Sequence, residues 1–231
     1  MCIRDSRYSC TDFVVEDLTK RKDKGEMHPF TDDMFKPASY LASIIWDSIG
    51  DNLKSARVGM KFLQDIARIV SKLQLPIHWV TPVGFPVYQS YPEMKSKRVK
   101  AMLMGEVIKP RINVEDDKTD RLRMSNGVAP NLVHSVDSAA MIETVNVALD
   151  NGIENFCNVH DSFGTTAADV HMLNETLRDA FVKIFQDDVL QDFRDGIEVL
   201  LPEKDRELLP DVPEKGKLNL DDLRQSEFFF A

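Results

Sequence analysis

The segment from Asn155 to Thr166 places the strongest local constraint on how this chain can fold. An apolar-leaning run ends in His160-Asp161, the small polar Ser162 follows, and a second β-prone run begins. This order is typical of a tight β-hairpin, because a short polar turn separates two runs that favour extended backbone. We therefore expect a hairpin that carries the carboxylate of Asp161 at its tip. Such a carboxylate can bind Mg²⁺, which proteins commonly hold through one or two carboxylates together with substrate phosphate oxygens.

The composition sets broad limits on the class of protein. The chain has 231 residues, enough for one large domain or two small ones with a hydrophobic core. Its apolar runs are far shorter than the roughly 20 residues that cross a bilayer, and no N-terminal segment resembles a secretion signal. The cysteines, Cys2, Cys10 and Cys157, lack the spacing of a metal site and fit a reducing compartment. These features predict a cytoplasmic protein with no membrane segment.

Charge is unevenly distributed along the chain. The formal net charge of −9 weighs against nucleic-acid binding, but the local distribution matters more than the sum. One basic cluster is opposed only by Glu106, and it consists of Lys95, Lys97, Arg98, Lys100, Lys109 and Arg111. The cluster is either a binding surface for nucleic acid or a solvated loop without a ligand, and the residues alone leave both possibilities open.

Periodic apolar residues predict most of the helices. The expected ranges are 7–21, 38–49, 54–73, 130–150, 170–185 and 190–200. Gly50 is the expected stop of the second helix, and Pro130-Asn131 is the expected start of the fourth. Residues 22–35 and the charged residues 115–126 are expected to form loops.

Extended segments are predicted between these helices. Residues 77–88 are rich in β-branched and aromatic side chains and are interrupted by prolines and a glycine. Segments 98–104 and 106–112 flank Gly105, which predicts a second hairpin that is long and partly exposed.

Four segments, taken in order, point to one known family. They are His78–Pro82 followed by Gly84–Val87, then Gly127–Asp137, then the hairpin at 155–166, and finally Glu227–Ala231. Together they resemble the phage-type single-subunit DNA-dependent RNA polymerases, in which a His-Asp-Ser-Phe-Gly-Thr motif supplies the second of two metal-binding aspartates. The resemblance runs from about Arg7 to the last residue. Residues 1–6 match nothing in the family and are expected to be a cloning or gene-assembly scar.

The resemblance implies an α+β fold, in which a helical fingers portion packs beside a small antiparallel palm sheet of a right-hand polymerase. It implies fingers at 7–77, a specificity hairpin at 78–112, a return to the fingers at 113–134 and a C-terminal palm at 135–231. It also implies transcription, with a DNA template and promoter, ribonucleoside triphosphates and an RNA product. Ser162-Phe163-Gly164 is phage-like, so we expect a viral member, monomeric, in the cytoplasm of the infected host cell.

The resemblance assigns the catalytic role to Asp161, as a ligand of two Mg²⁺ ions about 4 Å apart that stabilise charge during nucleotidyl transfer. The alternative role for Asp161 is that of a turn cap. His160 is expected to support the site from the opposite face of its strand. Phe228–Phe230 are expected to dock because exposing them is costly. In the family such a terminus folds back, so the end carboxylate of Ala231 is expected to help beside the active site.

Nucleic-acid contacts are expected at two places. His134 is expected to donate to minor-groove acceptors near the primer end, with Asp137 orienting it; the alternative is a core or capping histidine. The second place is the basic hairpin, which resembles the promoter-reading loop of the family. Its expected readers are Arg98, Lys100 and Lys109, while Arg111 is expected either to contact phosphate or to pair with an acidic neighbour.

Two other functions stay open at this point. One is a metal-dependent phosphohydrolase that uses the His160-Asp161 pair, and the other is a non-catalytic DNA-binding module built on the basic hairpin. Neither explains Gly127–Asp137 or Glu227–Ala231. The first metal aspartate of the family and its nucleotide-binding Lys/Tyr helix have no counterpart here, and Tyr8 falls past the position of that tyrosine. We therefore expect a C-terminal fragment that, alone, neither transcribes nor binds a promoter tightly.

Overall fold

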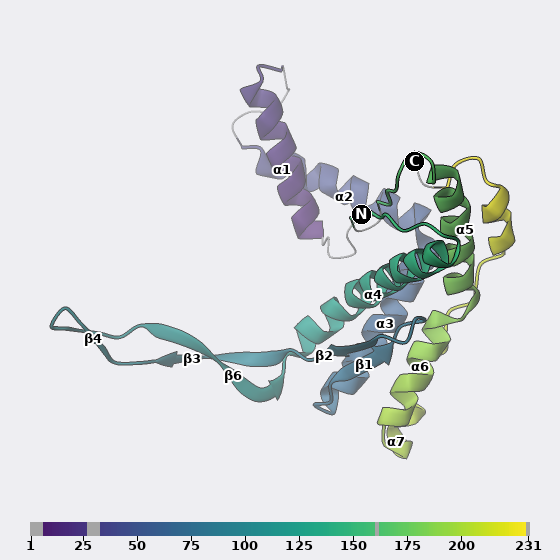
Figure 1. Cartoon of the computed structure of the whole chain (residues 1–231). Helices are drawn as coiled ribbons and strands as arrows, with labels where there is room; N and C mark the ends of the chain where they lie inside the picture. The colour runs from purple at the N-terminus through teal and green to yellow at the C-terminus, as the bar shows by residue number, and fades with distance from the viewer. Residues whose placement is uncertain (1–6, 27–32, 160–161, 230–231) are drawn as a thin grey trace. The chain divides into compact units, whose positions relative to one another are not determined.

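The computed structural model describes residues 7–26, 33–159 and 162–229. These residues form α-helices and three antiparallel sheets of two strands each, as an α+β fold requires (Figure 1). The chain divides into two units, Met1–Lys61 and Phe62–Ala231, and each is described by itself. Within the described ranges, no helix is both long enough and apolar enough to cross a membrane. The finer division into fingers, hairpin and palm stays a prediction.

Two helices pair in the first unit. α1 (Arg7–Asp23) packs on α2 (Phe35–Asn52), which buries Ala38 and Ala42. The expected stop of α2 at Gly50 is wrong, because Gly50 has no positive φ that would end the helix, and the last turn closes with the Leu53 N–H donating to Ile49 O at 2.9 Å. Residues 22–23 also belong to α1, so the expected loop starts later than 22.

α3 (Lys54–Lys72) confirms the predicted helix at 54–73. The buried residues of its apolar face recur at spacings of four positions or fewer, as expected for a helix; they are Phe62, Leu63, Ile66, Ala67 and Val70. The helix ends where Gln74 adopts a φ of +59° and the Leu75 N–H donates to Val70 O at 3.3 Å.

The first hairpin of the second unit follows α3 directly. β1 (Ile77–Val80) pairs with β2 (Pro86–Gln89), with Ile77 opposite Gln89. One face of β1 is buried, and the Trp79 ring meets Phe193 of α6 (Val189–Leu200) edge-on at 5.8 Å between centroids. The 77–88 segment is therefore two paired strands that lie against helices.

The basic hairpin is an exposed two-stranded ribbon (Figure 1). β3 (Pro92–Arg98) pairs with β6 (Arg111–Thr119), and β4 (Ala101–Leu103) pairs with β5 (Glu106–Ile108) nearer the tip. The expected loop at 115–126 is wrong, because β6 continues to Thr119. The charged sequence is compatible with a strand here because Asp116 forms a 2.7 Å ion pair with Lys95 on the neighbouring strand.

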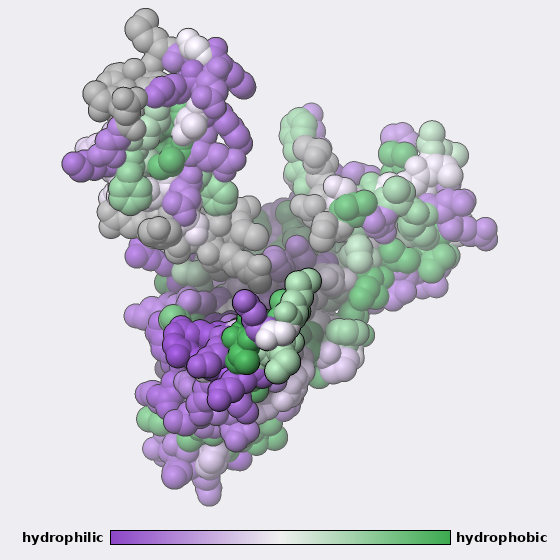
Figure 2. Space-filling model, turned by 90° about the vertical axis from the view of Figure 1, so that its left-hand side faces the viewer, coloured by the Kyte–Doolittle hydropathy of each residue, from purple (hydrophilic) through white to green (hydrophobic). Residues whose placement is uncertain are grey.

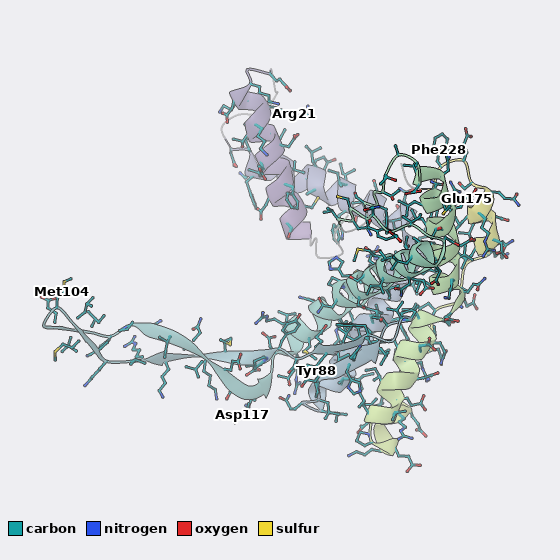
Figure 3. All side chains as sticks on the ribbon, viewed as in Figure 1. Arg21, Tyr88, Met104, Asp117, Glu175 and Phe228 are labelled. Carbon is teal, nitrogen blue, oxygen red and sulfur yellow. The ribbon has the colours of Figure 1, made fainter. Side chains whose placement is uncertain are left out.

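The tip of this ribbon is a turn with an unusual residue. Met104 is 99% exposed and has a φ of +52°, and Gly105 follows with a φ of +85°. Positive φ at both central residues is the geometry of two-residue hairpin turns, where Asn and Gly are favoured and a side chain such as Met is strained. Figure 3 shows Met104 at the free end of the ribbon and Tyr88 near its base.

Met104→Asn should stabilise the tip by about 0.5–1 kcal/mol, because Asn tolerates positive φ better than Met. We expect hydrogen exchange of the β4 and β5 amides to slow about two- to fivefold. Met102→Asn is the matched control, since Met102 is also exposed but has no positive φ. Equal slowing in both variants would show that hydrophilicity, and not backbone strain, limits the stability of the tip.

α4 (Arg121–Asp150) is the longest helix of the described chain. Asp120 caps it, with its Oδ1 accepting from the Arg123 N–H at 3.0 Å. The expected start at Pro130 is wrong, since Pro130 lies inside the helix. The proline lacks the N–H that would donate to the Asn126 carbonyl, and Asn126 is exposed, so solvent can serve that carbonyl instead.

The C-terminal elements confirm the remaining helix predictions. α5 (Val170–Gln186) and α6 (Val189–Leu200) match the predicted ranges closely, and a single helical turn, α7 (Glu203–Arg206), follows. The 3₁₀ helix η1 (Leu220–Gln225) then packs on α5. α4 and α5 share a core in which Val136, Ala139 and Ile184 are buried.

Candidate functional site

The backbone on either side of His160-Asp161 is paired. The Val159 N–H donates to Ser162 O and the Ser162 N–H donates to Val159 O, both at 2.9 Å. Further out, the Cys157 N–H donates to Gly164 O at 2.9 Å. This pairing is an isolated bridge and not two strands, so the predicted palm sheet around the turn is not formed among the described residues. His160 and Asp161 lie outside those residues, and their roles stay predictions.

Hydrophobic packing holds this turn segment in place. Phe156 and Phe163, one on each side of the turn, pack on a buried cluster that includes Ile153 and Leu173. Gly164 permits the close approach of the two sides, since a Cβ atom there would lie 3.0 Å from the Cys157 carbonyl oxygen. The turn is therefore anchored to the start of α5 and to the end of α4.

The described residues supply no complete metal site. No group of three or more His, Cys, Asp or Glu side chains lies together in 7–26, 33–159 and 162–229. A phosphohydrolase of the kind considered above needs several His and Asp ligands, so this part of the chain gives that alternative no support. A Mg²⁺ site that uses one protein carboxylate and substrate oxygens is compatible with the same observation.

His134 is an exposed residue in the middle of α4, so it is neither a core histidine nor a cap. It lines a hollow of about 320 Å³ together with Asp137, Ser138 and Met141. The Ser138 hydroxyl donates to the His134 carbonyl at 2.9 Å. Among the described residues no hydrogen bond or ion pair joins the side chains of His134 and Asp137, so the expected orienting contact is not made in this structure.

The basic hairpin places like charges opposite each other. Arg98 at the end of β3 is the cross-strand partner of Arg111 at the start of β6, an arrangement that destabilises an isolated ribbon. Lys100 and Lys109 continue the pair toward the tip, and all four side chains are exposed. Figure 2 views the ribbon toward its tip, where apolar residues lie among hydrophilic ones.

Most of this positive charge is not neutralised by the ribbon itself. Within the described chain, Lys95 is the member of the basic cluster that forms an ion pair, and its partner is Asp116. The contact lowers the pKa of the Asp116 carboxyl and raises the pKa of the Lys95 ammonium. The other cations of the cluster are free to attract an anionic ligand.

The C-terminal tail docks on α5, but through fewer phenylalanines than expected. The Phe229 ring meets Phe181 edge-on at 5.1 Å, and the Arg178 guanidinium lies 5.3 Å from the Phe229 centroid. Docking of Phe228 was expected and is wrong, because Phe228 is 78% exposed. Phe230 and Ala231 lie outside the described residues, so the role of the end carboxylate stays a prediction.

Arg178 is the central residue of this docking, and no role for it was predicted from the sequence. Its Nη1 donates to Leu223 O at 2.7 Å and to Ser226 O at 2.6 Å, and its Nε donates to Asn174 Oδ1 at 2.9 Å. Arg178 is only 9% exposed. The one available signal was an arginine between apolar residues of a strongly periodic helix.

Comparison with known proteins agrees with these features. A family model for DNA-dependent RNA polymerase matches residues 5–208. The chain is 36% identical to T7 RNA polymerase of Escherichia phage T7, over 84% of the chain and 24% of that protein. It is 36% identical to the DNA-directed RNA polymerase of Enterobacteria phage K11, over 94% of the chain and 26% of that protein.

Organellar enzymes are also similar. The chain is 30% identical to DNA-directed RNA polymerase 1, mitochondrial, of Nicotiana sylvestris, over 99% of the chain and 22% of that protein. The chain thus spans about a quarter of the length of these relatives. Because the family model covers most of its residues, the chain belongs to the DNA-dependent RNA polymerase family.

Proposed function

We propose that this chain is the C-terminal portion of a single-subunit polymerase that synthesises RNA on a DNA template. The family match over residues 5–208 is the observation that carries the proposal. The relatives are DNA-directed RNA polymerases, which supports a DNA template and ribonucleoside triphosphates, and the proposal adds a promoter and an RNA product. The proposal also keeps the predictions of a monomer, of a viral origin in the cytoplasm of an infected host cell, and of a chain that is inactive alone.

Asp161 is the proposed catalytic residue. Its turn is supported by the paired backbone of Val159 and Ser162 and by the packing of Phe156 and Phe163. Bound Mg²⁺ would stabilise negative charge on the attacking 3′ oxygen and on the leaving pyrophosphate. The chain would supply the Asp161 carboxylate, while phosphate oxygens, water and a residue beyond the described part would complete the ligand set.

His134 is the proposed contact to the growing duplex. It is exposed, and it borders the hollow formed with Asp137, Ser138 and Met141. A ring N–H at this position can donate to the purine N3 and pyrimidine O2 acceptors that correct pairs present in the minor groove.

A hybrid polymerase tests the proposed function. In it, residues 7–231 replace the segment of T7 RNA polymerase that they match, and the remainder of that protein, which the match does not cover, is kept. We expect the hybrid to extend an RNA primer on a DNA template with Mg²⁺ and ribonucleoside triphosphates, and the 231-residue chain alone to add no nucleotide. A folded hybrid that binds the primer-template but extends nothing would contradict the proposal, as would extension by the isolated chain.

A DNA-binding role for the basic hairpin is part of the same proposal. The like-charged pair Arg98 and Arg111 and the exposed Lys100 and Lys109 favour a polyanionic ligand. The apolar side chains of the exposed tip supply no hydrogen-bond donors, so we assign base contacts to the cations. Without the rest of the polymerase, the chain should bind duplex DNA only weakly.

The Lys100→Ala/Lys109→Ala variant should weaken duplex binding and flatten its dependence on salt. A lysine that reaches into a groove also neutralises a nearby phosphate, and each neutralised phosphate contributes about 0.9 to the slope of log K against log salt, so the slope should fall by up to about 1.8. Fluorescence anisotropy between 20 and 200 mM salt would measure it. Lys204→Ala/Lys217→Ala is the matched control, because both of these lysines are exposed and lie outside the ribbon. An equal loss in the two variants would contradict the proposed surface.

A further inference from the structure

The base of the basic hairpin packs on one face of α4. Tyr91 immediately precedes β3, and its carbonyl accepts from the Asp120 N–H at 2.8 Å, which closes the base of the ribbon. The Arg123 guanidinium carbon lies 5.0 Å from the centroid of the Tyr91 ring. Four residues later, a Cβ atom at Gly127 would come within 2.9 Å of the same ring. The ring is therefore held against the helix, and only glycine leaves it enough space.

Asn131 lies four residues further along the same face of α4. It contacts both the end of β2 and the residue that precedes β3. Its Nδ2 donates to Gln89 Oε1 at 2.8 Å and to the Tyr91 hydroxyl at 3.0 Å. Gln89 is the last residue of β2 and is 3% exposed, and its Nε2 donates to Met124 O at 2.9 Å. Both amide hydrogens of Asn131 thus have acceptors on the segment that leads into the ribbon. The two Asn131 hydrogen bonds are partly buried, and the Gln89 bond to Met124 O is buried. Hydrogen bonds shielded from water in this way are directional and stronger than exposed ones.

The same helical turn presents His134. Ser135 lies four residues after Asn131 on the same face of α4, and its hydroxyl accepts from the Trp79 Nε1–H at 2.9 Å. His134 lies between Asn131 and Ser135 in the sequence and is exposed. One turn of α4 therefore holds β1, β2 and the base of the ribbon through Asn131 and Ser135, while it carries His134 on a neighbouring face.

We propose that Asn131 is a positioning residue that fixes the direction of the basic hairpin relative to the turn of α4 that carries His134. This inference rests on the proposed function. If the direction of the ribbon is fixed, the distance between the DNA bound by the ribbon and the duplex contacted by His134 is fixed as well. Without the Asn131 amide, the Tyr91 ring loses a hydrogen-bond donor to its hydroxyl and Gln89 loses its link to this turn. The ribbon would then be free to rotate about the backbone hydrogen bond between the Asp120 N–H and the Tyr91 carbonyl.

A distance measurement by double electron–electron resonance tests the inference in the full chain. Spin labels are attached at Ser96→Cys on β3 and Asn146→Cys on α4, both exposed positions, after Cys2, Cys10 and Cys157 are replaced by serine. We expect a narrow distance distribution in this parent. Asn131→Ala should broaden it at least twofold, and Tyr91→Phe, which removes only the hydroxyl, should broaden it less.

Tyr88→Phe is the matched control, since Tyr88 is 69% exposed and near the same base. The inference predicts the parent distribution for this variant. If Asn131→Ala lowers the melting temperature strongly, Tyr91→Phe decides the question, because the loss of one hydroxyl keeps the ring packed. Parent-like widths in both Asn131→Ala and Tyr91→Phe would overturn the inference, and so would equal broadening in Tyr88→Phe.

A duplex titration separates this inference from the proposed function. Broadening in Asn131→Ala together with duplex binding by the parent supports both. Broadening without any duplex binding by the parent would leave Asn131 as the positioning residue of the ribbon and would count against the DNA-binding role of the hairpin. Duplex binding with unchanged widths would retain the DNA-binding role and reject Asn131.

Discussion

Replacing Asp161 with asparagine in the hybrid polymerase should reduce primer extension by at least about 10²–10³-fold. Asparagine keeps the shape of the side chain but removes the negative charge, so its neutral oxygen would bind a hard divalent cation far more weakly than a carboxylate does. The flanking pairing between Val159 and Ser162 uses backbone atoms, so the turn itself should survive the change. Single-turnover extension by one nucleotide, at saturating primer-template and fixed Mg²⁺, measures the effect on chemistry.

Asp150→Asn provides the control for this experiment. Asp150 is an exposed carboxylate at the end of α4, and the substitution makes the same change of charge and shape. We expect its extension rate to stay within about twofold of the parent hybrid, since surface substitutions away from special features change little. If Asp161→Asn retained a rate within tenfold of the parent, Asp161 would not be a metal ligand, and the role of a turn cap would be the better account.

Replacing Arg178 with alanine should release the C-terminal tail from α5. The substitution removes hydrogen bonds from a buried cation to Leu223 O and Ser226 O, and it removes the guanidinium from the face of Phe229. Hydrogen bonds that involve a charged group contribute about 1.5–3 kcal/mol each, and the tail can recover part of this by becoming solvated. We expect the docked state to lose about 2–3 kcal/mol, which raises the undocked population about 30- to 150-fold.

Carboxypeptidase digestion followed by mass spectrometry measures this undocking, because cleavage tracks the population of the open state when docking is fast. Arg224→Ala is the control, since Arg224 pairs with Asp179 at the exposed surface of the same tail. We expect its digestion rate to stay close to that of the parent, as exposed ion pairs contribute little. Equal acceleration in both variants would show that charge, and not the buried bonds of Arg178, retains the tail.

The elements that the sequence predicted well are those whose signal is local. α3 and α5 each repeat apolar residues at helical spacing over several turns, and the residues on that face are the buried ones. The hairpin around Gly105 was also found because a glycine separates two β-prone runs. In these elements the pattern that selects the secondary structure also determines which face is buried, so no information from distant residues is needed.

The elements that the sequence predicted poorly depend on distant partners. The charge of residues 115–119 suggested a loop, but pairing with β3 brings Lys95 to Asp116 across the ribbon. Pro130 suggested a helix start, yet Asp120 supplies a cap ten residues earlier and the proline costs only one backbone bond. Each error came from a residue with a strong local preference that a neighbouring strand or an earlier cap overrode.

The candidate site shows the same division. The pairing around His160-Asp161 follows from a local pattern, and its backbone bonds are present. Arg178 and Asn131 could not be recognised in advance, because the partners that define their roles, Leu223 and Ser226 for Arg178 and Gln89 and Tyr91 for Asn131, lie between 40 and 48 residues away in the sequence. The roles of such side chains depend on contacts that exist only in the folded chain, and the sequence carries no periodic pattern that would reveal them.

The exposed ribbon has a consequence for how its reach can change between related polymerases. Side chains on paired strands alternate between two sides, so one extra residue in each strand would turn the tip over and present the opposite edge to a ligand. Two extra residues in each strand would restore the original orientation at a greater distance. Ribbons of related polymerases that present the same edge to the ligand should therefore differ in length by steps of two residues per strand. The reach of the ribbon can change only in these discrete steps.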